Sequence, residues 1–132
     1  MLVADTNLIA YLNIEGKFTR QAELIFLKDN NWIVPFLWRS EFCNILATYL
    51  RQKIITLETA RINFATAQTQ LADNEYEVDP LAVIDECQHT GLSASEAEYV
   101  VLAQKLGLPL VTNDRKILET HPGFAVRIAD YL

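Results

Sequence analysis

The chain opens with Met1-Leu-Val-Ala-Asp5-Thr-Asn-Leu-Ile9, an apolar run that an acid ends after four residues. The run predicts a short buried strand over about Leu2–Ala4, and the apolar residues that follow recur at helical spacing. A second apolar run, Leu110-Val-Thr112, is followed after one residue by another acid, Asp114. A strand that leads through an acid into a helix is therefore predicted near both ends of the sequence.

The residues between these two runs alternate between short strands and helices. Helices are expected over about residues 20–28, around residue 41, and over about 56–71, 80–91, 93–107 and 116–119, with strands at 32–34, 76–78, 110–112 and 124–128. Asp79-Pro80 gives an N-cap with proline at the first helical position, which is a strong start signal. Short strands that alternate with helices pair in parallel. The sequence therefore predicts an α/β three-layer sandwich, with a short, mostly parallel central sheet and helices on both faces.

Size and composition indicate one globular domain spanning residues 1–132. The chain is 51% hydrophobic and 21% charged, and it has no internal repeat or linker. Its apolar runs are far shorter than the roughly 18 residues of a membrane helix, and its start lacks the basic residues of a signal peptide. Cys43 and Cys87 have no CxxC spacing. We expect reduced thiols in a cytoplasmic protein, with Cys43 packed as a small hydrophobe.

The net charge of −6 argues against a protein that binds nucleic acid through bulk electrostatics. It does not exclude nucleic acid as a partner. Four acids that bound one or two divalent ions would bring the charge of the folded protein towards neutral, and the 11 Lys and Arg residues could still line one rim.

Four acids stand out because of where the predicted elements place them: Asp5, Glu41, Glu96 and Asp114. Asp5 and Asp114 follow strands, and in parallel α/β sheets ligands bind beyond the carboxyl ends of the strands. Glu41 borders the apolar stripe of its helix, three residues after Trp38, with no Lys or Arg three or four residues away. Inward-facing carboxylates need a cation or a proton, and an all-oxygen set of ligands favours Mg²⁺ or Mn²⁺.

Three of these acids also have a structural interpretation as helix caps. Asp5 and Asp114 precede helices, and Ser93-x-x-Glu96 has the sequence of a capping box. A comparable interpretation is harder to build for Glu41. The cap positions nevertheless fall at one edge of the sheet, where like charges would raise one another's pKa unless a metal intervenes. The combination therefore favours a metal site.

Four segments in register resemble the PIN-domain family, and more narrowly the VapC-type toxin ribonucleases of VapBC toxin–antitoxin pairs. The segments are residues 3–9, 35–46, 91–103 and 106–114, and together with their spacing they extend over nearly the whole chain. The resemblance implies a metal-dependent endoribonuclease that hydrolyses phosphodiester bonds of single-stranded or structured RNA. Its cofactor would be Mg²⁺ or Mn²⁺.

Carried over by position, the resemblance implies that Asp5, Glu41, Glu96 and Asp114 are the catalytic residues and metal ligands. Glu96 stands where the family usually has Asp. The extra methylene moves the carboxylate by about one bond length, and catalytic geometry is sensitive to shifts near 1 Å. Supporting polar residues are expected at Asn7, Asn44 and Thr112, and candidate RNA contacts at Arg39, Arg115 and Lys116.

The resemblance also implies partners: RNA, an antitoxin protein whose tail fills the acidic groove, and a second copy in a homodimer, with no membrane. Residues 32–49 and 54–71 are apolar enough to supply an interface, or equally a core. The main alternative is a catalytically impaired PIN-like module that binds RNA or protein. A receiver-type phospho-acceptor domain is disfavoured because Asp5 has no acidic neighbour, and a phosphatase with an Asp-x-Asp motif because position 7 is Asn.

Overall fold

The computed structural model describes residues 1–132 and contains a five-stranded sheet in which every pairing is parallel. The strands are β1 (Leu2–Ala4), β2 (Trp32–Pro35), β3 (Glu75–Tyr76), β4 (Leu110–Val111) and β5 (Ala125–Val126). Their order is β3-β2-β1-β4-β5, so β1 lies at the centre. In the register of the sheet Val3 pairs with Ile33 on one side and with Leu110 on the other. The residue that follows β1 is therefore flanked by the ends of β2 and β4.

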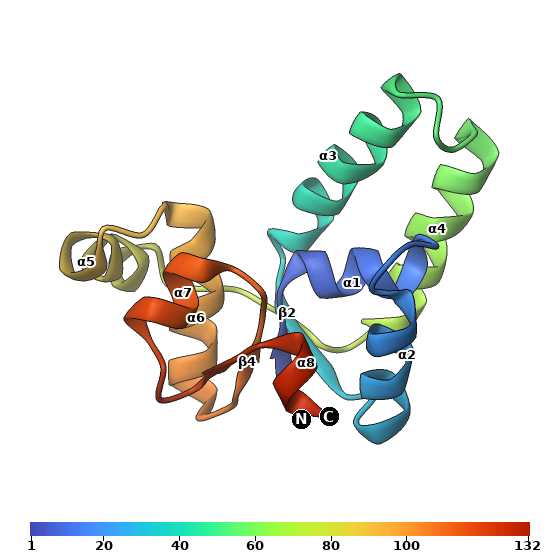
Figure 1. Ribbon diagram of the computed structural model, residues 1–132. Coiled ribbons are helices and arrows are strands. Elements are labelled where there is room, and N and C mark those ends of the chain that lie inside the picture. Colours follow the sequence, from blue (N-terminus) through green and yellow to red (C-terminus); the bar gives the residue numbers. More distant parts are fainter.

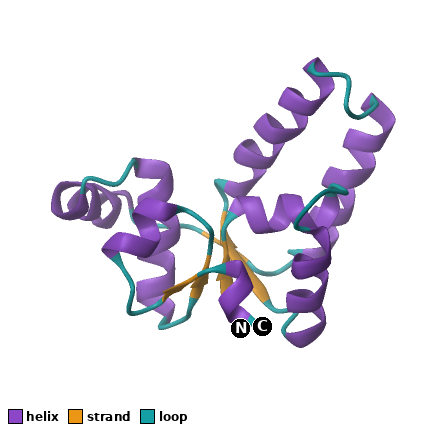
Figure 2. Cartoon of the chain, viewed as in Figure 1, coloured by secondary structure: helices purple, strands orange, loops and turns teal.

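Helices cover both faces of this sheet (Figures 1 and 2). One side carries α1 (Thr6–Asn13), α2 (Thr19–Lys28), α3 (Trp38–Arg51) and α4 (Leu57–Gln70), with the short α8 (Ile128–Tyr131) beside α2. The other side carries α5 (Pro80–Thr90), α6 (Ala94–Leu106) and α7 (Arg115–Thr120). This arrangement confirms the predicted α/β class and the PIN-like three-layer sandwich.

The two faces of the sheet feed two separate hydrophobic cores. Leu2 and Ala4 of the central strand pack with the α1–α4 side, and Val3 between them packs with α6 and α7. Successive side chains of a strand point to opposite faces. Because both faces are covered, the central strands are apolar at every position, which is why the opening run of the sequence has no polar alternation.

Local capping chemistry explains several helix boundaries that the sequence predicts. Thr56 accepts a hydrogen bond from the backbone N–H of Thr59 at the start of α4, and Asp79 caps α5 with Pro80 at its first position. Gly91 and Gly107 end α5 and α6 with φ of 76° and 64°, a conformation that glycine adopts without steric cost.

The C-terminal segment differs from its prediction as a strand over residues 124–128. The strand is limited to Ala125–Val126, and the chain then turns into α8. The backbone N–H of Ile128 donates to Asn113 Oδ1 at 3.2 Å, and Arg127 Nε pairs with Asp130 Oδ2 at 2.9 Å within one helical turn. These contacts end the strand early. The predicted strand at 76–78 is also displaced, and lies at Glu75–Tyr76.

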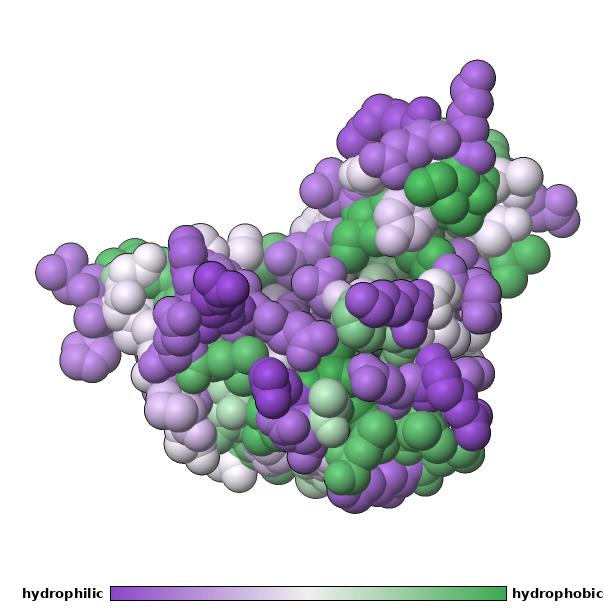
Figure 3. Space-filling view, viewed as in Figure 1, coloured by the Kyte–Doolittle hydropathy of each residue, from purple (hydrophilic) through white to green (hydrophobic).

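Helices α3 and α4 form an arm that projects from the body of the molecule (Figure 1). The rings of Trp38 and Phe42 each stack on Phe64, with centroids 5.3 and 6.1 Å apart, and this aromatic cluster joins the two helices. Cys43 is exposed on the arm, so its predicted packing as a small hydrophobe is wrong. The arm leaves part of α3 without a covering layer, and Figure 3 shows apolar side chains at its surface.

None of the helices combines the length and apolar character that a membrane span requires.

Candidate functional site

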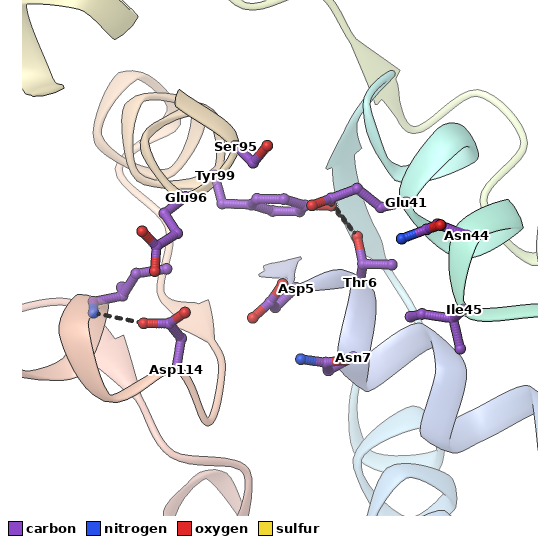
Figure 4. A pocket seen from close by; sticks show the side chains of 11 residues that line it. Asp5, Thr6, Asn7, Glu41, Asn44, Ile45, Ser95, Glu96, Tyr99 and Asp114 are labelled. Atoms are coloured by element: carbon purple, nitrogen blue, oxygen red, sulfur yellow. Dashed lines mark hydrogen bonds between the residues drawn. The ribbon is translucent and has the colours of Figure 1, made fainter. Parts of the chain in front are cut away.

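A cavity of about 260 Å³ opens at the carboxyl edge of the sheet, between α1 and α3 on one side and α6 and α7 on the other (Figure 4). All four acids singled out in the sequence line this cavity: Asp5, Glu41, Glu96 and Asp114. Asn7 and Asn44 line it as well, whereas Thr112 is fully buried and reaches the site through Asp5. The fold therefore gathers at one point acids that are spread along the whole sequence.

Asp5 directly follows the central strand and turns its side chain towards β4. It occupies the N-cap position of α1, but its side chain makes no capping hydrogen bond. Instead Asp5 Oδ2 accepts a hydrogen bond of 2.6 Å from the hydroxyl of Thr112. Capping therefore does not explain this residue.

The electrostatic environment of Asp5 disfavours its charged form. Burial raises the pKa of Asp5 to about 6, and the hydrogen bond from Thr112 offsets only part of that rise. The neighbouring carboxylates of Glu41 and Asp114 raise the pKa further. A carboxyl whose pKa is raised by burial and by like charges is typical of a functional site.

Asp114 caps a helix and also lines the cavity. It caps α7, because its Oδ1 accepts a hydrogen bond of 3.0 Å from the backbone N–H of Ile117. Its own backbone N–H donates to Thr112 Oγ1 at 2.9 Å. The Thr112 hydroxyl therefore links Asp5 and Asp114, donating to the first and accepting from the second.

Glu96 completes the capping box that its sequence predicts. Its Oε1 accepts from the backbone N–H of Ser93 at 2.9 Å, and Ser93 Oγ accepts from the backbone N–H of Glu96 at 3.2 Å. The same carboxyl group lies near Asp114 and affects its pKa. Glu96 thus caps α6 and also lines the cavity.

The carboxyl groups of Glu96 and Asp114 have pKa values shifted in opposite directions. Burial, and then the hydrogen bond and the charge of Glu96, raise the pKa of Asp114. Burial acts in the same direction on Glu96, but the hydrogen bond from Ser93, that with Asp114 and the charge of Lys116 outweigh it and lower the pKa of Glu96.

Two hydroxyl groups donate hydrogen bonds to Glu41, and no Lys or Arg side chain pairs with it. The Thr6 hydroxyl donates to Glu41 Oε1 at 2.8 Å, and the phenol of Tyr99 donates to the same oxygen at 2.6 Å. The hydroxyl oxygens of Thr6 and Tyr99 also lie next to each other. Three elements, α1, α3 and α6, therefore meet at one carboxylate oxygen.

The hydrogen bonds of all four acids follow one pattern. Protein donors reach a single oxygen of each carboxylate: Asp5 Oδ2, Glu41 Oε1, Glu96 Oε1 and Asp114 Oδ1. The second oxygens have no such donor. Each side chain is thereby fixed in place while its second oxygen remains available.

The donor set suits a hard divalent cation by its chemistry. It consists of carboxylate oxygens with side-chain amides nearby, the ligands that Mg²⁺ and Mn²⁺ prefer. In this conformation, however, no group of three or more His, Cys, Asp or Glu side chains is arranged to hold one ion. Binding would therefore require side chains such as Glu96, now bonded to Ser93, to adjust.

The three candidate RNA contacts lie in different surroundings. Arg115 and Lys116 are exposed at the start of α7, next to Asp114. Arg39 does not line the cavity, and instead forms two hydrogen bonds to Glu75, at 2.6 and 2.8 Å.

Thr6 and Tyr99 belong to the site but do not stand out in the sequence. Tyr99 falls on the apolar stripe of its helix, where a core residue is expected, and Thr6 has the place of an ordinary first residue of a helix. One signal was available, because a buried tyrosine needs a hydrogen-bond partner for its hydroxyl. The sequence alone does not say which residue that partner is.

The chain matches no family profile and no curated protein. Solved structures nevertheless share its fold. The crystal structure of PAE2754 from Pyrobaculum aerophilum has a TM-score of 0.75 at 21% identity, covering 98% of this chain and 93% of that one. A chain of a toxin–antitoxin complex from Klebsiella pneumoniae has a TM-score of 0.67 at 16% identity, covering 97% and 98%. At these identities the likeness establishes the fold alone.

Proposed function

We propose that this protein is a metal-dependent endoribonuclease, the toxin of a toxin–antitoxin pair, which hydrolyses phosphodiester bonds of single-stranded or structured RNA. The observation that carries the proposal is the set of four carboxylates around one cavity, each anchored through one oxygen. The fold shared with a chain of the Klebsiella toxin–antitoxin complex supports it.

In this proposal Asp5, Glu41, Glu96 and Asp114 hold one or two Mg²⁺ or Mn²⁺ ions. When bound, such an ion polarises a phosphoryl oxygen, lowers the pKa of an attacking water and stabilises the leaving oxygen. The residues of the chain then act as ligands and orienters. Thr112 keeps Asp5 turned towards Asp114 through its hydrogen bonds to both.

A side-chain nucleophile is not part of the proposal. His121 lies outside the cavity, paired with Glu86 at 3.2 Å and packed against the ring of Phe124. His89 is exposed on α5 and also lies outside it. Ser95 lines the cavity, but no histidine lines it with Ser95 to act as a base.

We propose further that an antitoxin docks on the arm. An apolar groove between α3 and α4 has a volume of about 380 Å³ and is lined mainly by hydrophobic side chains, among them Leu46, Leu50 and Phe64. The same helix, α3, also carries Glu41 of the cavity. A homodimer is the other association that the resemblance implies.

The decisive experiment is cleavage of a labelled single-stranded RNA with Mg²⁺, Mn²⁺ or EDTA, comparing wild type with Asp5→Asn. Asp85→Asn is the matched control, because Asp85 is an exposed acid on α5 outside the cavity. We expect metal-dependent cleavage by wild type and by the control, and none by Asp5→Asn. Equal cleavage by all three preparations would mean that a contaminant is responsible.

A catalytically impaired PIN-like binding module is the second candidate, and a specific observation favours it. Glu96 is committed to the capping box, and no three acids are arranged to hold an ion. Calorimetric titration with Mn²⁺ separates the two functions. Binding that Asp5→Asn abolishes supports the nuclease, whereas no binding at millimolar Mn²⁺ supports the impaired module.

A further inference from the structure

The phenol of Tyr99 lies in the wall of the cavity, although its ring belongs to the core behind the sheet. Tyr99 is 2% exposed and packs with Val3, Ile33 and Val100. Figure 4 shows its side chain extending from α6 across the cavity towards Glu41 on α3. A core residue on one side of the sheet, Tyr99, thus places its hydroxyl group beside an acid on the other side, Glu41.

The hydroxyl groups of Thr6 and Tyr99 bond to the same oxygen of Glu41. Both Thr6 and Tyr99 donate to Glu41 Oε1, and no protein donor reaches Oε2. Thr6 is also buried, at 4% exposure. Glu41 therefore has one oxygen satisfied by the protein and one left for a ligand.

The hydrogen bond of the Tyr99 hydroxyl differs from the one that a buried tyrosine ordinarily makes. Any backbone carbonyl would satisfy the hydroxyl, yet the Tyr99 hydroxyl donates to Glu41 and otherwise contacts only Thr6, and both of these residues line the cavity.

We propose that Tyr99 and Thr6 are positioning residues that hold Glu41 by Oε1, so that Oε2 is presented to a divalent cation in the cavity. The inference rests on the proposed metal-dependent function and adds two residues to it. Neither hydroxyl contacts the RNA in this scheme. Their effect on catalysis passes entirely through the orientation of Glu41. Partners that orient metal ligands in this way typically change metal affinity or activity by about 10- to 100-fold when they are removed.

The test removes one oxygen atom and keeps the ring. Tyr99→Phe is compared with Tyr131→Phe, because the Tyr131 hydroxyl also donates to a carboxylate, Asp29 Oδ2 at 3.1 Å, but lies near the chain termini, away from the cavity. The readouts are Mn²⁺ affinity, from the spin-resonance signal of free Mn²⁺, and kcat and KM for RNA cleavage. We expect Tyr99→Phe to lose about tenfold in Mn²⁺ affinity and at least as much in kcat, with KM unchanged. Tyr131→Phe should match wild type.

A second pair of variants guards against a folding defect. Thr6→Val removes the other hydroxyl with little change of shape, and Thr6→Ser restores it. Thr6→Val should weaken Mn²⁺ binding and Thr6→Ser should recover it, with circular dichroism showing the same helical content in both. If Tyr99→Phe does not fold, the comparison at Thr6 decides the matter by itself.

The outcomes separate this inference from the proposed function. If wild type binds Mn²⁺ and cleaves RNA, but the variants at Tyr99 and Thr6 do so equally well, the positioning role is wrong and the nuclease stands. If Tyr131→Phe shows the same losses as Tyr99→Phe, the effect is general destabilisation and the positioning role is again wrong. If wild type neither binds Mn²⁺ nor cleaves, both proposals are overturned.

Discussion

Thr112 and Asp5 are 107 residues apart in the sequence, yet the hydroxyl of one donates a 2.6 Å hydrogen bond to the carboxylate of the other. The contact depends on the pairing of β1 with β4, which brings the ends of these two strands side by side. Through its second hydrogen bond, from the backbone N–H of Asp114, Thr112 also ties the start of α7 to the site. One hydroxyl thus fixes two of the four acids relative to each other.

Removal of that hydroxyl should destabilise the fold and alter Asp5. In Thr112→Val the Asp5 carboxylate loses a donor and the N–H of Asp114 loses an acceptor, so we expect a loss of about 1–3 kcal/mol in the free energy of unfolding. Because this hydrogen bond lowers the pKa of Asp5, that pKa should rise above its present value of about 6 in the variant. Urea unfolding and carboxyl NMR titration measure the two effects. Thr112→Ser, which keeps the hydroxyl, should preserve the pKa.

The stability of the metal-free protein should fall as the pH rises through the pKa of Asp5. Burial raises that pKa from 3.8 to about 6, so the folded state binds the proton more tightly than the unfolded state does. The stabilisation is complete below about pH 4 and is lost as the pH passes 6, a difference of about 3 kcal/mol. Asp5→Asn avoids this cost. In EDTA it should therefore be more stable than wild type at pH 7.5, and about equally stable at pH 4.

The control for this pH effect is Asp85→Asn, which removes an exposed charge and should follow wild type at both values of pH. A bound cation should reverse the ranking, because Mn²⁺ stabilises the state that binds it. Wild type should then gain stability at pH 7.5 on addition of Mn²⁺ while Asp5→Asn does not. If Asp5→Asn were less stable than wild type in EDTA at pH 7.5, the buried charge would not be the dominant influence at this position.

Shortening the side chain of Glu96 should lower the stability of the protein and strengthen its binding of Mn²⁺. In Glu96→Asp the carboxylate no longer reaches the backbone N–H of Ser93, so half of the capping box is removed, at a cost of about 0.5–1 kcal/mol. The released carboxylate has both oxygens free, and we expect tighter Mn²⁺ binding and faster cleavage. Ser93→Ala removes the other half of the box and should lower stability without improving binding. Weaker Mn²⁺ binding by Glu96→Asp would show that the longer side chain is the better ligand here.

The basic residues at the start of α7 should contribute to RNA affinity through charge alone. For Arg115→Ala or Lys116→Ala we expect weaker binding to every RNA sequence. The slope of log K against log salt should fall by about 0.7 for each RNA phosphate that the variant no longer neutralises. Arg39→Ala should change the slope less, because Glu75 already neutralises Arg39. These titrations use EDTA and the Asp5→Asn background, so that cleavage does not interfere. An unchanged slope for both α7 variants would remove them from the RNA surface.

Elements set by local chemistry could be predicted from the sequence. Thr56, Asp79 and Ser93 each announce a helix start by a side chain that bonds a nearby backbone N–H, and the structure contains all three caps. The prediction for the end of the chain was wrong because a distant residue decides its conformation. The N–H of Ile128 bonds to Asn113, and nothing within residues 124–128 indicates that contact.

Some residues of the candidate site could likewise be predicted from the sequence, and others could not. The four acids could be found because carboxylates after strands and within apolar stripes are conspicuous. The roles of Thr6 and Tyr99 could not, since a threonine and a tyrosine in predicted helices resemble ordinary helix and core residues. The role proposed for them depends on α1, α3 and α6 meeting at Glu41, which is a property of the tertiary fold.

The parallel pairing of β1 with β4 also determines when the cavity can exist. A growing polypeptide leaves the ribosome from its amino end, at about 5–20 residues per second, so Asp5 emerges several seconds before Asp114. Until β4 arrives, the first strand lacks one neighbour and Asp5 lacks the hydrogen bond from Thr112. In the proposed nuclease, a chain that has not yet reached Asp114 therefore has an incomplete set of acids.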